Sequence, residues 1–209
     1  MPICVLRNKS RGRVYRDVNG FAARYARHWK DWLVVEAAAR SELFGQILRK
    51  WQATRPVAMR RLRAEARHEP PFLEDLLTSA SECIETLGNL NVLTIRERTE
   101  SQGQALMDLW RILGQLPTSG TASCVGISKA LLLLTNGRLG PAFDSKVRRQ
   151  LGIGKPLSVT CAVWIATLEE IAEDIRAFEA AHGSLAKAVP QRFAHLAYGR
   201  LYDMALGPR

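Results

Sequence analysis

The sequence lacks the features of a membrane protein. Its uninterrupted apolar runs, such as residues 130–134, are far too short to cross a bilayer. The first residues contain neither the apolar stretch nor the small-residue cleavage site of a signal peptide. We therefore expect a soluble protein of the cytoplasm, in the cytosol or nucleoid of a bacterium, with no membrane partner.

Cysteine and histidine are also scarce. There are four of each in 209 residues, and no two cysteines have the close spacing that metal ligands show. We interpret the cysteines as reduced, mostly buried thiols of an intracellular protein. The sequence predicts no bound metal and no cofactor.

Positive charge is abundant and unevenly distributed. The formal net charge is +10, and residues 1–67 contain 16 Lys and Arg against 5 Asp and Glu. Residues 68–209 contain 14 basic and 15 acidic residues, so the excess belongs to the first third of the chain. A one-sided basic excess of this size favours a polyanionic partner, and nucleic acid is the common one.

Apolar residues recur at helical spacing almost throughout, and no stretch alternates as a strand does. The sequence therefore predicts an all-α fold. The expected helices cover residues 20–52 (as one or two helices), 57–67, 72–87, 102–116, 127–135, 145–151, 158–182 and 190–206.

The segment 116–152 is the most informative part of the chain. Val125 and Gly126 precede an apolar helix whose N-terminal N–H groups are suited to a phosphate, and Lys129 lies near its start. Asp144 has the position of an N-cap before a short basic helix, whose positive end favours a carboxylate there. One interpretation of Asp144 is a plain cap, and the other is a catalytic carboxylate.

This segment resembles the helix-hairpin-helix DNA glycosylase superfamily. The hairpin of that family reads L-P-G-V-G-x-K-[TA], and a segment of the type P-x-x-D-[TS]-x-V-x-R-x-x-x-[LR]-G follows it. About forty residues carry the resemblance, namely Leu116, Pro117, Val125, Gly126 and Lys129, then Pro141, Asp144, Ser145, Val147, Arg148, Leu151 and Gly152.

The resemblance implies a two-lobed helical bundle with an active-site cleft between its lobes. Residues 100–156 would carry the helix-hairpin-helix motif and the catalytic aspartate. Residues 1–99 would form a basic helical part, and the helices of 157–209 would pack with that N-terminal lobe.

The resemblance also implies a function. The protein would bind double-stranded DNA as a monomer, flip out a damaged or modified base and hydrolyse its N-glycosidic bond. Glucosylated hydroxymethylcytosine in phage DNA is one expected substrate, and ordinary base repair is equally open. Asp144 and Lys129 would be the catalytic residues, and the DNA-binding residues would be Val125, Gly126, Ser128, Lys146, Arg148 and Arg149.

Lys129 lies a few residues closer to Asp144 than the family's lysine does, and residues 118–124 are an insertion. We therefore predict a monofunctional enzyme that releases a base without efficient strand cleavage.

Two alternatives belong to other classes. A non-enzymatic DNA-binding module would keep the hairpin and the basic face without the chemistry. Arg63 and His68 also have the R-x4-H spacing of HEPN-type ribonucleases, in which the two side chains act on a phosphodiester.

Overall fold

A computed structural model describes residues 2–54, 72–116 and 124–207, with the side chains of Phe72 and Leu157 left out. The described residues form nine α-helices and no strand, which confirms the all-α prediction for this part of the chain. The helices are α1 (Arg11–Asn19), α2 (Ala23–Val34), α3 (Arg40–Lys50), α5 (Phe72–Leu87), α6 (Glu100–Leu113), α7 (Cys124–Leu134), α8 (Ser145–Leu151), α9 (Cys161–His182) and α10 (Tyr198–Leu206). Short 3-10 turns connect them at Ala37–Ala39, Ile95–Glu97, Pro156–Ser158, Leu185–Ala188 and Gln191–Phe193.

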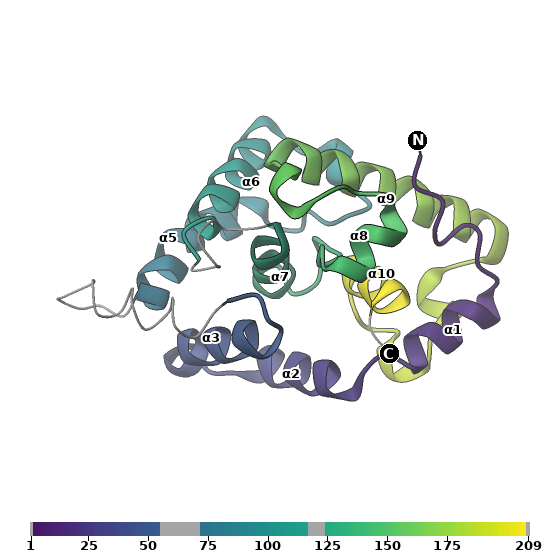
Figure 1. Cartoon of the computed structure of the whole chain (residues 1–209), viewed down its shortest axis with the longest axis horizontal. Coiled ribbons are helices and arrows are strands. Elements are labelled where there is room, and N and C mark those ends of the chain that lie inside the picture. The colour runs from purple at the N-terminus through teal and green to yellow at the C-terminus, as the bar shows by residue number, and fades with distance from the viewer. Residues whose placement is uncertain (1, 55–71, 117–123, 208–209) are drawn as a thin grey trace.

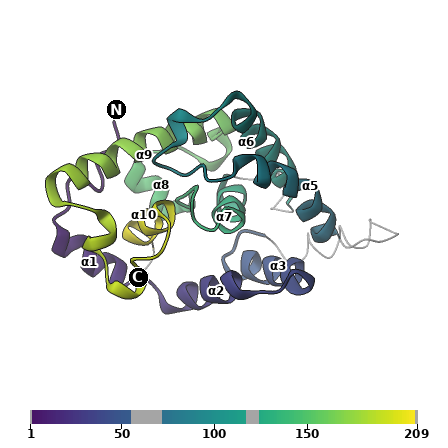
Figure 2. The ribbon, with the colours of Figure 1, turned by 180° about the vertical axis from the view of Figure 1, so that it is seen from behind.

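Helix α7 lies at the centre of the molecule, with α5, α6 and α9 on one side and α2 and α3 on the other (Figures 1 and 2). Nine of its eleven residues are buried, and its side chains are apolar on almost every face. A helix that is apolar all round is stable only when other elements surround it, which is the environment that α7 has here. Lys129 is the one charged residue of this helix.

The N-terminal segment is fastened to the C-terminal helices by one buried carboxylate. Asp174 of α9 is fully buried and accepts hydrogen bonds from the backbone N–H groups of Leu6 (2.6 Å) and Arg7 (3.1 Å). It also accepts the Nε–H of Arg7 and the hydroxyl of Tyr202 in α10. Both ends of the chain are thereby held against α9, and α1 packs on α10.

The last predicted helix, 190–206, is wrong in its extent. A 3-10 turn covers Gln191–Phe193, and α10 begins only at Tyr198. The backbone is extended at Ala197, and the first turn of α10 then lies against the 137–140 turn, where a Cβ added to Gly199 would be 2.6 Å from both the carbonyl of Gly137 and the nitrogen of Gly140. The free N–H of Arg200 in the first turn of α10 donates to that Gly137 carbonyl at 2.9 Å.

Helix α7 also begins earlier than predicted, at Cys124 rather than Ile127. Val125 and Gly126 therefore lie inside its first turn instead of before it, and Lys129 lies in the second turn. The predicted helix 57–67 falls outside the described residues, and none of the described helices is long and apolar enough to cross a membrane.

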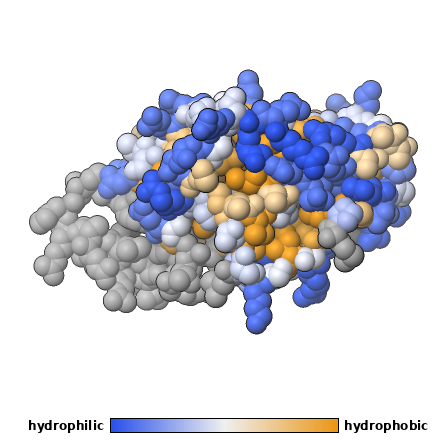
Figure 3. All heavy atoms as spheres, turned by 90° about the horizontal axis from the view of Figure 1, so that it is seen from above, coloured by the Kyte–Doolittle hydropathy of each residue, from blue (hydrophilic) through white to orange (hydrophobic). Residues whose placement is uncertain are grey.

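The face on which α6 and α9 lie is viewed directly in Figure 3, and apolar surface occupies part of its centre. Two large apolar side chains of these helices, Met107 and Val163, are exposed. Hydrophilic residues surround the apolar area in this view.

Candidate active site

Asp144 caps helix α8, as its position in the sequence predicts. Its backbone is extended, and its Oδ1 accepts hydrogen bonds from the N–H groups of Lys146 and Val147, both at 2.9 Å. These are two of the N–H groups that a helix start leaves without an internal partner. Both bonds go to the same oxygen, so the second oxygen, Oδ2, accepts no hydrogen bond among the described residues.

Lys129 reaches from α7 to the C-terminal end of α3. Its Nζ donates to the backbone carbonyl of Trp51, which follows α3, at 2.5 Å. Burial lowers the pKa of Lys129 from its usual value, and the negative charges of Asp144 and Asp203 act in the opposite direction. The amine is therefore half-buried, close to two carboxylates and held by one hydrogen bond.

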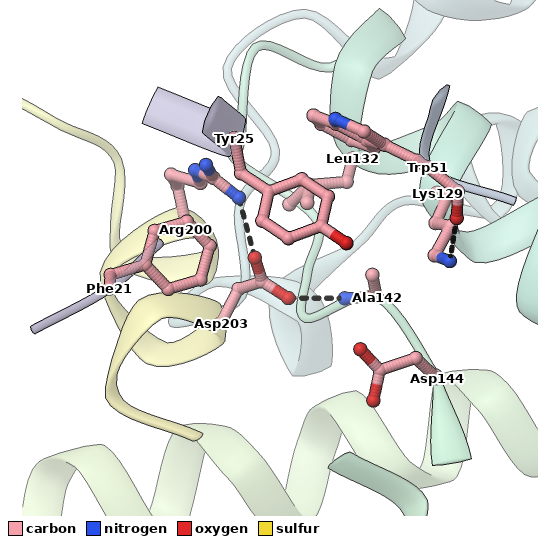
Figure 4. A pocket seen from close by; sticks show the side chains of 9 residues that line it. All are labelled: Phe21, Tyr25, Trp51, Lys129, Leu132, Ala142, Asp144, Arg200 and Asp203. Atoms are coloured by element: carbon pink, nitrogen blue, oxygen red, sulfur yellow. Dashed lines mark hydrogen bonds and ion pairs between the residues drawn. The ribbon is translucent and has the colours of Figure 1, made fainter. Parts of the chain in front are cut away.

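Asp144 and Lys129 line the same pocket, although 15 positions separate them in the sequence. The pocket has a volume of about 30 Å³, which is room for one or two water molecules. In Figure 4 the side chains of Tyr25, Asp144 and Asp203 surround one space, with Lys129 at its side. The lining residues are Phe21, Tyr25, Trp51, Lys129, Leu132, Ala142, Asp144, Arg200 and Asp203.

Three aromatic rings form one wall of this pocket. Tyr25 lies between Phe21 and Trp51, with ring centroids 5.9 Å from the first and 6.0 Å from the second. Phe21 and Trp51 are buried, whereas Tyr25 is only half-buried. The central ring of the three is therefore the one that is partly open to solvent.

A buried ion pair also lines this pocket, beside the aromatic rings, and sequence reasoning missed it. The Nη1 of Arg200 donates to Oδ2 of Asp203 at 2.6 Å, and Oδ1 of Asp203 accepts the N–H of Ala142 at 3.0 Å. Burial raises the pKa of Asp203, while the charge of Arg200 lowers it. The sequence does contain a signal for this pair: Arg200 and Asp203 have opposite charges and lie three positions apart in an otherwise apolar helix.

The residues predicted to bind DNA at the start of α7 are mostly enclosed. Val125 is half-buried and Gly126 is buried. The hydroxyl of Ser128 is inside the molecule, where it accepts the N–H of Phe143 at 2.8 Å and donates to the carbonyl of Val125 at 3.4 Å. Ser128 thus fixes the loop that carries Asp144 onto α7.

The three basic residues of α8 differ in what they contact. Lys146 donates to the carbonyl of Gly207 at 2.6 Å, and Arg148 donates to the carbonyls of Phe143 and Gly154. Arg149 is exposed and makes no hydrogen bond or ion pair with the described residues. The DNA contacts of all three remain predictions, and Arg149 is the one whose donors face solvent.

The remaining candidates lie elsewhere. Arg63, His68 and the predicted loop residues 117–123 fall outside the described residues. Within residues 2–54, 72–116 and 124–207, no group of three His, Cys, Asp or Glu side chains could hold a metal ion. Burial raises the pKa of Cys124 and that of Cys161 to about 11, so both thiols stay protonated at neutral pH.

Comparison of the chain with protein-family models, with curated proteins and with solved structures found no match.

Proposed function

We propose that the protein is a monofunctional DNA glycosylase with its active site at the pocket of Asp144 and Lys129. The observation that carries the proposal is that these two residues, singled out by the sequence, line one aromatic pocket next to a second carboxylate. The basic excess of residues 1–67 supports double-stranded DNA as the partner.

Asp144 supplies the negative charge that the reaction needs. Cleavage of an N-glycosidic bond develops positive charge on the sugar, and a fixed carboxylate beside C1′ stabilises it. The α8 N–H groups hold the carboxylate by Oδ1, which leaves Oδ2 for the sugar or for the attacking water. Preorganised electrostatic groups of this kind lower the activation free energy by about 3–4 kcal/mol.

Lys129 positions the pocket wall in this mechanism. A lysine that forms a Schiff base must present a neutral amine to C1′. The amine of Lys129 is held by the carbonyl of Trp51, to which it donates, and so ties α7 to the aromatic wall. This contact favours simple hydrolysis, whose product is an abasic strand that stays intact until alkali is added.

Tyr25 is the side chain that would admit the base. A volume of about 30 Å³ does not hold a purine or pyrimidine ring, so a side chain must move first. Rotation of the half-buried Tyr25 opens a slot between Phe21 and Trp51, in which a flipped base stacks. Stacking of a base on an aromatic side chain is worth about 1–3 kcal/mol, which offsets part of the cost of extrusion.

The decisive experiment is incubation with duplexes that contain alkylated, oxidised, deaminated and glucosylated hydroxymethyl bases. Mass spectrometry then identifies the free base that is released. The Asp144→Asn variant keeps the size and the capping oxygen but removes the charge, so base release falls by about 10²–10³. Asp75→Asn on exposed α5 makes the same charge change away from the pocket and keeps the parent rate.

Two results decide against the proposal. No base released from any duplex, with tight and salt-dependent DNA binding, identifies the non-enzymatic binding module. Base release by Asp144→Asn at the parent rate removes Asp144 from the mechanism.

A further inference from the structure

A second and larger cavity lies between α2 and the segment that leads into α10. Its volume is about 670 Å³, which is within the usual range of small-molecule sites. The face of α2 opposite the aromatic pocket contributes Arg27, Lys30 and Leu33, and the other wall is formed by residues 192–196 with Arg200 and Met204. Arg200 is the one residue that lines both this cavity and the Asp144 pocket.

Two residues that line the cavity, Arg200 and Trp29, have buried donors with no acceptor among the described residues. Arg200 is 2% exposed, and its Nε and Nη2 donate to no acceptor among the described residues, since Nη1 alone makes the bond to Asp203. Nε and Nη2 form the edge of a guanidinium that fits two oxygens of one phosphate or carboxylate. The indole Nε1–H of Trp29, also buried and lining the cavity, is a third unpartnered donor.

Stacking fixes the orientation of this guanidinium. Its central carbon lies 4.6 Å from the ring centroid of Trp29 and 4.8 Å from that of Phe21. Two rings that pack on one cation hold its donor edge in place before any ligand arrives. Buried donors are normally paired, so this preorganised pair is suited to an acceptor that comes from outside the chain.

The charges at the rim favour an anion that carries more than one negative charge. Arg27 and Lys30 are exposed on α2, and Arg192 faces them across the opening. Asp31 is the only acidic residue among the lining side chains, and Asp203 neutralises the single charge of Arg200, so the excess comes from Arg27, Lys30 and Arg192. A phosphate monoester, with a charge of about −1.5 to −2 at pH 7, matches this excess better than a carboxylate does.

The rest of the lining is apolar, with Leu33, Phe193, Leu196 and Met204 beside the rings. A free inorganic ion would leave most of this volume unfilled. From the unpartnered donors of Arg200 and Trp29, the basic rim and the apolar walls, we propose that the cavity binds a phosphate monoester on a ring-sized body, as in a mononucleotide. This site is separate from the proposed glycosylase reaction, and its existence does not depend on that reaction.

The test is titration of the full chain with adenosine 5′-monophosphate, and separately with adenosine and with inorganic phosphate. The indole N–H signals of the five tryptophans are recorded by ¹H–¹⁵N NMR, and Trp29→Phe assigns the signal of Trp29. The Trp29 signal moves downfield with the nucleotide, because its N–H gains an acceptor. The nucleotide binds at least about tenfold more tightly than adenosine or inorganic phosphate alone. Only the nucleotide contacts both the unpartnered donors and the apolar walls of the cavity.

Two charge reversals provide the matched comparison. Lys30→Glu at the rim weakens nucleotide binding by about tenfold, and Lys155→Glu, equally exposed and outside the cavity, leaves it unchanged. A single-stranded oligonucleotide with a 5′-phosphate, compared with its 5′-hydroxyl form, distinguishes a strand end from a free nucleotide as the source of the phosphate. The proposal is overturned if no phosphate monoester moves the Trp29 signal, or if both reversals weaken binding equally.

Discussion

The two carboxylates of the pocket are held in place in different ways. Asp144 accepts its hydrogen bonds from residues two and three positions further along the chain, at the start of its own helix. Asp203 accepts one from Ala142, 61 positions away, and pairs with an arginine that is stacked on Phe21 and Trp29. The position of Asp144 is thus set locally, whereas that of Asp203 depends on the packing of the whole molecule.

This difference separates the roles that the two residues have in the proposed enzyme. Asp144 is half-buried and retains an oxygen without a hydrogen bond, as a group that meets a substrate requires. Both oxygens of Asp203 are engaged within a buried ion pair. We infer that Asp144 performs chemistry and that Asp203 positions the 140–144 loop on which Asp144 stands.

The largest expected effect is the loss of stability on Asp203→Ala. This substitution leaves Arg200 charged and unpaired in the interior and also removes the acceptor of the Ala142 N–H. We expect the free energy of unfolding, measured by urea denaturation, to fall by about 3–5 kcal/mol.

Asp108→Ala is the matched control for that experiment. Asp108 also pairs with an arginine three positions away, Arg111, but on the surface of α6, where the arginine side chain is 73% exposed. A surface pair contributes at most about 1 kcal/mol. Equal losses in the two variants would show that burial of the Arg200–Asp203 pair has no energetic consequence.

An intermediate effect is expected for Ser128→Ala, which tests how the loop is attached to α7. The Phe143 N–H loses its acceptor inside the molecule, and a buried donor without a partner costs about 1–3 kcal/mol. Ser158→Ala is the control, because its exposed hydroxyl donates only to the carbonyl of Lys155 within its own turn. Urea denaturation measures the free energy of unfolding of both variants. Surface substitutions usually change it by less than about 0.5 kcal/mol, so a loss that small for Ser128→Ala would contradict this role of the hydroxyl.

The contrast between local and distant contacts also explains which parts of the molecule the sequence predicts. Helix α8 and its Asp144 cap follow from neighbouring residues, and the structure confirms both. The start of α10 does not, because the periodicity of Phe193, Leu196 and Leu201 runs on smoothly. The helix begins where Gly199 packs against the 137–140 turn, which is a contact between distant parts of the chain.

The same reasoning applies to the site. Asp144 and Lys129 could be named from a short segment, and they do line one pocket. The catalytic role of Asp144 and the positioning role of Lys129 stay predictions. Tyr25, Arg200 and Asp203 come from the two ends of the chain, so no local pattern indicated that they would complete the same pocket.

The smallest expected effect concerns the cap itself and tests whether Asp144 is held only by local contacts. Asn at position 144 still offers an oxygen to the N–H groups of Lys146 and Val147, so Asp144→Asn changes the free energy of unfolding by less than about 1 kcal/mol. Asp144→Ala removes the acceptor and costs about 1 kcal/mol, the usual value of an N-cap. Both values are well below the loss expected for Asp203→Ala, because Ser145 and Lys146 at the start of α8 are exposed and the Lys146 N–H can bind water when the cap is absent. Parallel urea denaturation of the three variants checks this order. If Asp144→Ala were as costly as Asp203→Ala, Asp144 would belong to the buried network, and its function would be to hold the fold rather than to meet a substrate.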